Sequence, residues 1–134
     1  RDAQESRGLG DVYKRQVFDN GDGRAFQQPE NAAEKYSRAV MYRIDEKKGT
    51  VEQIWEYGKK RGHELYSAIT SSVEYQADHD SIVVYWASRK LAEGGEPILT
   101  EFKRGGQEPV FEMALKGTMG YRAVVIDVKK AFNP

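Results

Sequence analysis

Residues 19–23 of the chain, DNGDG, offer side-chain oxygens that could hold a calcium ion. A calcium loop places its oxygen ligands at alternate positions. Counting from Asp19 reaches only glycines, and counting from Asn20 reaches Asp22 and then the cation Arg24. The same residues suit a tight turn whose glycines adopt positive φ. The sequence therefore favours a turn over a metal site. The second alternative is a loop at the mouth of a ligand site, with Asn20 and Asp22 as candidate ligand contacts.

The two histidines, His63 and His79, lie in polar stretches of sequence, KKRGHELY and ADHDS. A nucleophilic imidazole needs a buried position, aim at the reacting atom and a partner that orients it. Both contexts indicate solvated surface positions instead. We therefore assign no catalytic residue to this chain.

Arg38 and a short polar run after residue 65 carry the other candidate chemistry. A guanidinium group binds tetrahedral oxyanions through two parallel hydrogen bonds and stabilises charge during group transfer. Arg38 therefore either faces such a ligand or pairs with a carboxylate at the exposed start of a strand. Tyr66, Ser67, Thr70 and Ser71 combine aromatic and hydroxyl character, which suits a pocket for an aromatic ligand. The same residues suit an ordinary loop that leads into a strand equally well.

Composition limits the classes of protein. A chain of 134 residues suits one domain or less. Its 21 basic and 21 acidic residues balance, and a nucleic-acid binder usually shows a basic excess. No apolar run approaches the roughly 20 residues of a membrane span. We therefore expect neither nucleic acid nor membrane as a partner, and no residue set predicts a metal or a cofactor.

Alternation of apolar and polar residues predicts an all-β fold, an antiparallel meander of short strands. The predicted hairpins span 36–57, 72–87 and 97–116. A last strand is predicted at 121–128, and short helices are plausible only around 30–35 and 87–93. A sandwich and a propeller would both give this pattern. In a propeller, the order indicates two strands that finish one blade, four that form a full blade, and one more.

Three strings, taken in order, resemble the C-terminal part of the bacterial aryl-sulfate sulfotransferases. They are VFDNGDGR, KYSRAVMYRIDEKKGTVEQIWEYGKKRG and ELYSAITSSVEY. WEYGKKRG is the most specific of them. The resemblance is close over residues 17–77, poor over 88–118, and returns at YRAVV near Tyr121. The string YSAITS has Ala68 where a common form of the family has proline.

The resemblance implies a fold and an activity. The fold would be a partial β-propeller, the C-terminal blades of a six-bladed one. The parent enzyme would move a sulfuryl group from an aryl sulfate donor to a phenolic acceptor through a sulfohistidine, without a nucleotide donor. It would lie in the periplasm, and a homodimer is compatible with it. A non-enzymatic β-propeller fragment, used for binding or as a scaffold, is the alternative.

Taken together with the resemblance, the functional alternatives given above for the candidate residues become specific. The family's catalytic histidine lies upstream of DNGDGR, so the chain by itself is expected to be inactive. Arg38 would face the sulfate, and Tyr66, Ser67 and Thr70 would line the phenol pocket. Asn20 and Asp22 would lie at the mouth of the active-site funnel.

Residues 1–16 read RDAQESRGLGDVYKRQ. The string DVYKRQ resembles translated sequencing-adapter DNA, a tail found on reading frames assembled from environmental DNA. The apolar residues of this segment fit neither a strand nor a helix. We expect residues 1–16 to be non-native and without structure, and residues 17–134 to form the propeller piece. A natural polar segment is the alternative.

Overall fold

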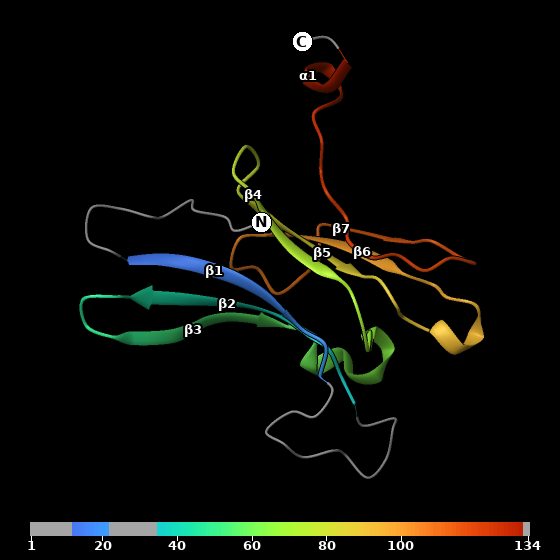
Figure 1. Cartoon of the computed structure of the whole chain (residues 1–134), viewed down its shortest axis with the longest axis horizontal. Helices are drawn as coiled ribbons and strands as arrows, with labels where there is room; N and C mark the ends of the chain where they lie inside the picture. The colour runs from blue at the N-terminus through green and yellow to red at the C-terminus, as the bar shows by residue number, and fades with distance from the viewer. Residues whose placement is uncertain (1–11, 22–34, 133–134) are drawn as a thin grey trace.

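A computed structural model describes residues 12–21 and 35–132 (Figure 1). Over these residues the protein is all-β, with two antiparallel sheets and few helical turns. The first sheet has the strand order β1-β2-β3 and the second β4-β5-β6-β7. The strands are β1 Val12–Asp19, β2 Arg38–Asp45, β3 Thr50–Tyr57, β4 Ser72–Gln76, β5 Ser81–Trp86, β6 Ile98–Lys103 and β7 Phe111–Ala114. The helical segments are the 3-10 turns η3 Lys59–Leu65 and η4 Leu91–Glu93, and the short helix α1 Val128–Phe132.

The three predicted hairpins are confirmed. β2 pairs with β3, β4 with β5, and β6 with β7, all antiparallel. The apolar run of β5 is buried along its whole length, as its sequence predicts for a strand covered on both faces. The pairing of β5 with β6 completes the four-stranded sheet.

The structure corrects part of the expectation for residues 1–16. Residues 12–16 form the first half of β1, which pairs with β2 from Val12 opposite Asp45 to Asp19 opposite Arg38. The open edge of β2 has unpaired N–H and C=O groups, and any non-proline backbone can bond to them. Residues 12–16 therefore pair with β2 although they show no apolar alternation. Residues 1–11 lie outside the described part of the chain.

The predicted strand at 121–128 is wrong. No ladder forms there within the described residues, and α1 begins at Val128. The contacts of this segment are single hydrogen bonds, from Ser71 N–H to Tyr121 O (2.9 Å) and from Ala123 N–H to Ser72 Oγ (3.2 Å). In Figure 1 the segment runs away from both sheets toward α1. A strand completes its backbone hydrogen bonds on a neighbouring strand, and this segment forms no ladder with any described strand.

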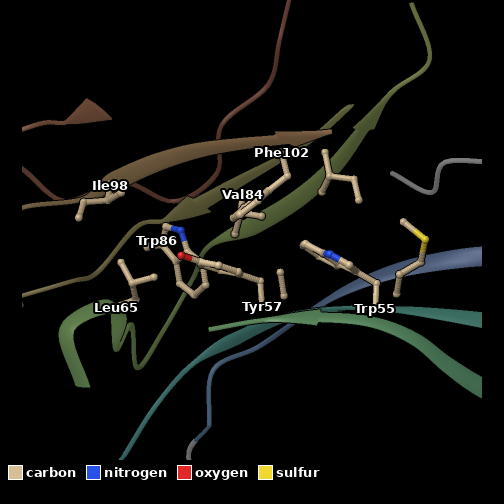
Figure 2. Packing of buried hydrophobic residues seen from close by; sticks show 10 residues of the cluster. Trp55, Tyr57, Leu65, Val84, Trp86, Ile98 and Phe102 are labelled. Atoms are coloured by element: carbon tan, nitrogen blue, oxygen red, sulfur yellow. The ribbon is translucent and has the colours of Figure 1, made fainter. Parts of the chain in front are cut away.

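The core fills the space between the two sheets (Figure 2). Trp86 of β5 is fully buried and Trp55 of β3 is 6% exposed, so both tryptophans are core residues. Ring edges meet ring faces across the sheets: Trp55 packs on Phe102 with centroids 5.5 Å apart, and Phe18 packs on Trp86 at 5.2 Å. Such pairs contribute about 0.5–1.5 kcal/mol each beyond their buried area.

Gly58 begins the connection from β3 to η3. Its φ is 136°, a value that side chains strongly disfavour. A Cβ at this position would lie 2.3 Å from the Ser37 carbonyl oxygen and 2.8 Å from Arg38 Cα. The backbones of the two segments therefore approach each other here more closely than any other residue would allow. This approach fixes η3 beside the start of β2.

Polar contacts from η3 and β3 fasten the two sheets together. Trp55 Nε1–H donates to Gly106 O at 2.8 Å. The guanidinium of Arg61 binds the Glu112 carboxylate through two bonds, at 2.6 and 3.1 Å, and Glu64 through a third at 2.9 Å. These carboxylates raise the pKa of Arg61, and Arg61 in turn lowers that of Glu64. These bonds hold η3 against β7.

Candidate functional site

Hydrogen bonds from the turn after β1 connect the first sheet to the loop 66–71, which precedes β4. The Asn20 amide Nδ2 donates to the carbonyl oxygens of Ser67 (2.7 Å) and Thr70 (3.0 Å). The Ser37 hydroxyl donates to Asn20 O at 2.8 Å and accepts the Ser67 N–H at 2.8 Å. Ser37 and Ser67 are both fully buried. Asn20 therefore holds the loop in place by binding two of its backbone carbonyl groups.

The Asp19 carboxylate organises this turn. One oxygen accepts the Gly21 N–H at 2.9 Å, and the other accepts Arg38 Nε–H at 2.9 Å. The φ of Gly21 is 88°, as predicted for a tight turn. Burial lowers the pKa of Arg38, but its hydrogen bond and ion pair with Asp19 raise it by more, so the guanidinium stays charged. Its side chain remains 22% exposed.

Serine hydroxyls form a second set of contacts behind the loop, here called the hydroxyl cluster: Ser67, Ser71 and Ser88. The Ser67 Oγ lies 2.7 Å from Ser71 Oγ and 2.8 Å from Ser88 Oγ. Ser88 Oγ donates to Ile69 O at 2.8 Å, and Ser71 Oγ accepts the Ala87 N–H at 3.0 Å. A serine nucleophile needs an adjacent base. In the described part of the chain, the partners of these hydroxyls are other hydroxyls and backbone groups, so the cluster positions the loop.

The loop that the hydroxyl cluster holds is strained. Thr70 and Ser71 have φ values of 59° and 87°, although neither is glycine. Each such residue costs about 1–3 kcal/mol, and such strain concentrates at ligand clamps and active sites. The Thr70 hydroxyl donates to Gly120 O at 3.1 Å, and the Ser71 N–H donates to Tyr121 O at 2.9 Å. The loop is therefore preorganised by contacts from several segments, which makes it the candidate site.

A cleft of about 590 Å³ lies between η3 and η4, beside this loop, and is here called the η3–η4 cleft. One wall carries the stacked rings of His63 and Tyr66, whose centroids are 5.1 Å apart and whose planes are inclined by 24°. The lining also includes Arg89, whose side chain is 8% exposed. Arg89 Nη1–H donates to Glu96 Oε1 at 2.6 Å, and this bond lowers the pKa of Glu96. The lining of the cleft thus combines two stacked rings with a partly buried ion pair.

Comparison with known proteins decides the family. A family model described as Arylsulfotransferase (ASST) matches residues 4–122. The chain belongs to the arylsulfotransferase family. Arylsulfate sulfotransferase AssT of Escherichia coli is 56% identical to it over 83 residues, and that of Lelliottia amnigena is 54% identical over 83 residues. The aligned residues make up 62% of this chain but only 14% of each relative. The resemblance drawn from the sequence strings is confirmed.

The structure of this arylsulfotransferase chain brings most of the predicted site residues together. Asn20, Ser67 and Thr70 meet in one hydrogen-bonded unit, and Tyr66 faces the η3–η4 cleft beside them. Ser67 is fully buried, so it holds the loop from behind. Arg38 lies at the start of β2 and binds Asp19, the residue that precedes Asn20. Asp22 lies outside the described residues, and its role stays a prediction.

Three residues of the site were missed from the sequence: Ser37, Ser88 and Arg89. Each is buried, with 0%, 4% and 7% of its surface exposed. Alternation patterns do not separate a buried polar residue next to a strand from an exposed one. The available signal was the position of Ser88 and Arg89 directly after the apolar run of β5, where the backbone is still covered.

Neither histidine of this arylsulfotransferase chain has the setting of a nucleophile. His63 is exposed, and its Nδ1 lies 3.1 Å from Lys35 O. His79 is exposed in the turn between β4 and β5. Among the described residues, no group of three His, Cys, Asp or Glu side chains could hold a metal ion. Over the same residues, no helix has the length and apolar character needed to cross a membrane.

Proposed function

We propose that the chain is part of an enzyme that transfers a sulfuryl group from an aryl sulfate to a phenol. The family match over residues 4–122 carries the proposal. Both relatives have the printed name of an arylsulfate sulfotransferase. Because the chain aligns with 14% of each relative, we place the reaction in a longer protein that contains this chain as a C-terminal piece.

The proposed reaction proceeds through a sulfohistidine. A histidine nitrogen attacks the sulfur of the aryl sulfate, a nitrogen–sulfur bond forms, and the aryl oxygen leaves with the bonding electron pair and takes up a proton. The oxygen of a second phenol then attacks the same sulfur and loses its proton, and the nitrogen–sulfur bond breaks. The exposed settings of His63 and His79 support a relay histidine that lies outside this chain.

In this proposal the described residues bind substrate and do not act as the nucleophile. Arg38 keeps its charge beside Asp19 and stabilises the developing charge on the sulfuryl oxygens. Tyr66 and the Thr70 hydroxyl contact the phenol from the strained loop, while Asn20 and Ser67 fix that loop. Asp22 joins them at the mouth of the funnel. The strained backbone at Thr70 supports a site here, because such strain concentrates at active sites. Groups that are already held in position stabilise developing charge most effectively.

We propose that the two sheets are neighbouring blades of a β-propeller. The strand order β4-β5-β6-β7, in which each strand pairs with the next along the chain, is the order expected of one blade. The resemblance further supports residence in the periplasm and is compatible with a homodimer. Cell fractionation and light scattering of the intact protein test these two proposals.

A chimera tests the proposed function. The aligned segment of the Escherichia coli arylsulfate sulfotransferase is replaced by the corresponding residues of this chain, and release of phenol from phenyl sulfate is followed in the presence of a second phenol. We expect the chimera to transfer the sulfuryl group and this chain alone to release no phenol. A folded chimera without transfer, or phenol release by this chain alone, would contradict the proposal.

A further inference from the structure

Exposed apolar side chains gather at the C-terminal end of the described part of the chain. Among the described residues, 11 of the 15 large hydrophobic side chains that are exposed lie between positions 110 and 132. Residues 121–127, here called the 121–127 segment, hold four of them, with 46–75% of their surface exposed: Tyr121, Val124, Val125 and Ile126. In Figure 1 the segment is a drawn-out stretch that leads away from both sheets. A cluster of this kind marks an interaction surface.

The start of the 121–127 segment is held by the rest of the chain. The Thr70 hydroxyl donates to Gly120 O at 3.1 Å, and the Ser71 N–H donates to Tyr121 O at 2.9 Å. Gly120 packs so closely on the Tyr85 ring that a Cβ at this position would overlap it. The segment therefore leaves the second sheet from a fixed point beside the strained loop.

One edge of the segment is already used, and the other is open. In an extended backbone the N–H and C=O of one residue point to one edge, and those of the next residue point to the opposite edge. The backbone groups of Tyr121 and Ala123 bond to Ser71 N–H and to Ser72 Oγ, so the odd-numbered residues face the start of β4. On the other edge, here called the even edge, the backbone groups form no hydrogen bond with any described residue: Arg122, Val124 and Ile126.

The side chains of the segment have the pattern of a strand that is buried on both faces. Because successive side chains of an extended chain point to opposite faces, Val124 and Ile126 lie on one face and Tyr121 and Val125 on the other. β5 is also apolar on both faces, and it is covered along its whole length. A partner of the segment must therefore bond to its even edge and also cover both of its faces.

A second copy of this chain does not meet both requirements. Two copies paired along their even edges would form a two-stranded ribbon with both apolar faces in water, and such a ribbon is marginally stable at best. A sheet inside a larger domain meets both. The aligned residues make up 14% of each relative, so the longer protein proposed above has ample chain for such a sheet.

We propose that the 121–127 segment completes a third sheet, by adding to an open strand edge in the part of the longer protein that lies outside this chain. The even edge makes the backbone hydrogen bonds, and that part of the protein covers the two apolar faces. Because Thr70 and Ser71 hold the start of the segment, the third sheet lies beside the strained loop. The inference rests on the proposed function only in placing the chain in a longer protein, and not on sulfuryl transfer.

Hydrogen exchange followed by mass spectrometry tests the pairing. The full chain is compared with a long chimera, in which the part of the Escherichia coli arylsulfate sulfotransferase that precedes the aligned segment is followed by this chain from the start of that segment to residue 134. We expect residues 122–127 to exchange at least about 100-fold more slowly in the long chimera than in the chain alone. β5, which is paired on both edges within the chain, should be protected in both proteins.

Equal exchange of residues 122–127 in the two proteins would overturn the proposal. So would a long chimera that does not fold, because the proposal holds that its upstream part supplies the edge that the segment completes. Protection of these residues in the chain alone that rises with its concentration would assign the segment to a second copy, and would overturn the proposal as well.

Two neighbouring valines provide matched variants of the long chimera. Proline removes one backbone N–H, so Val124→Pro removes a donor from the even edge and Val125→Pro removes one from the opposite edge. The two side chains are similarly exposed in this chain, at 59% and 46%. Val124→Pro should speed the exchange of the segment by at least about 10-fold, and Val125→Pro by less than about 3-fold. Equal effects of the two variants, or no effect of Val124→Pro, would refute pairing along the even edge.

Sulfuryl transfer by the long chimera separates this inference from the proposed function. A long chimera that transfers the sulfuryl group, but whose residues 122–127 exchange as fast as in the chain alone, refutes the third sheet and leaves the proposed function intact. A folded long chimera that protects these residues but transfers nothing refutes the proposed function and leaves the pairing in place.

Discussion

Replacing Gly58 by alanine should destabilise the protein far more than replacing Gly49. At Gly58 the φ of 136° is strained for any side chain, and the new Cβ would lie 2.3 Å from Ser37 O and 2.8 Å from Arg38 Cα. Both atoms belong to backbone that is fixed at the start of β2, so neither can move cheaply. Backbone strain of about 1–3 kcal/mol and overpacking of about 1–3 kcal/mol together predict a loss of about 2–6 kcal/mol.

Gly49 provides the control, because it has a φ of 65° and a methyl group added to it would meet nothing within 4 Å. Gly49→Ala therefore adds only the strain of a left-handed backbone, which costs about 1–2 kcal/mol. The reduced entropy of the unfolded chain offsets part of this cost. Its free energy of unfolding should fall by about 1 kcal/mol or less.

Urea titration followed by tryptophan fluorescence measures the difference. The chain's two tryptophans, Trp55 and Trp86, both lie in the core, so their emission reports loss of the packing between the sheets. With an m value of about 1.5 kcal/mol/M, the Gly58 variant should unfold at a urea concentration lower by about 1.3–4 M, and the Gly49 variant by under about 0.7 M. Equal shifts for the two variants would refute the close approach of Gly58 to Ser37.

Three further predictions concern the charged residues. In the active chimera, Arg38→Ala should lower turnover by about 100-fold, while Arg43→Ala, at an exposed ion pair on the same strand, should leave it unchanged; equal turnover in both variants would contradict the role of Arg38. Arg61→Met should lower the free energy of unfolding by about 1 kcal/mol by removing its bonds to Glu112, and Arg43→Met by clearly less. Glu96 has a lowered pKa in the folded state because of the arginine that binds it, so its ionised form stabilises the fold at neutral pH. Glu96→Gln should therefore unfold more readily than the parent at pH 7, and the difference should close as the pH falls below about 4.3. Denaturation at several pH values checks this, and a difference that persists at pH 2 would contradict it.

The hairpins could be predicted because alternation and turn residues lie next to each other in sequence. The pairing of β2 with β3 needs only the alternating residues of each strand and the turn that ends at Gly49. The first half of β1 could not be predicted, because its residues, VYKRQ, show no apolar alternation. Its pairing comes from the edge of β2, which no pattern within β1 reveals. Conversely, residues 121–127 have strand-forming side chains but pair with no described strand.

The candidate site was predictable only as a segment. Tyr66, Ser67 and Thr70 could be selected from the string they share with a family. Their different roles could not, because the sequence does not show that Ser67 points into a buried cluster while Tyr66 faces a cleft. The partners that decide these roles, Ser37 and Ser88, lie 30 and 21 positions away in the chain. Such long-range hydrogen bonds depend on how the sheets pack, which local pattern does not encode.

The order of the strands has a consequence for how the protein acquires its structure. Each strand of the second sheet pairs with its neighbour in the chain, and the connections at 77–80 and 104–110 are short. Closing a short loop costs little entropy, so the strands of this sheet can associate in the order in which they leave the ribosome. The contacts between Trp55 and Phe102 then require the second sheet to reach the first across a much longer separation in sequence. Docking of two already formed sheets should therefore be the slow step of folding, and the Trp55 emission should change after the backbone signal of the strands.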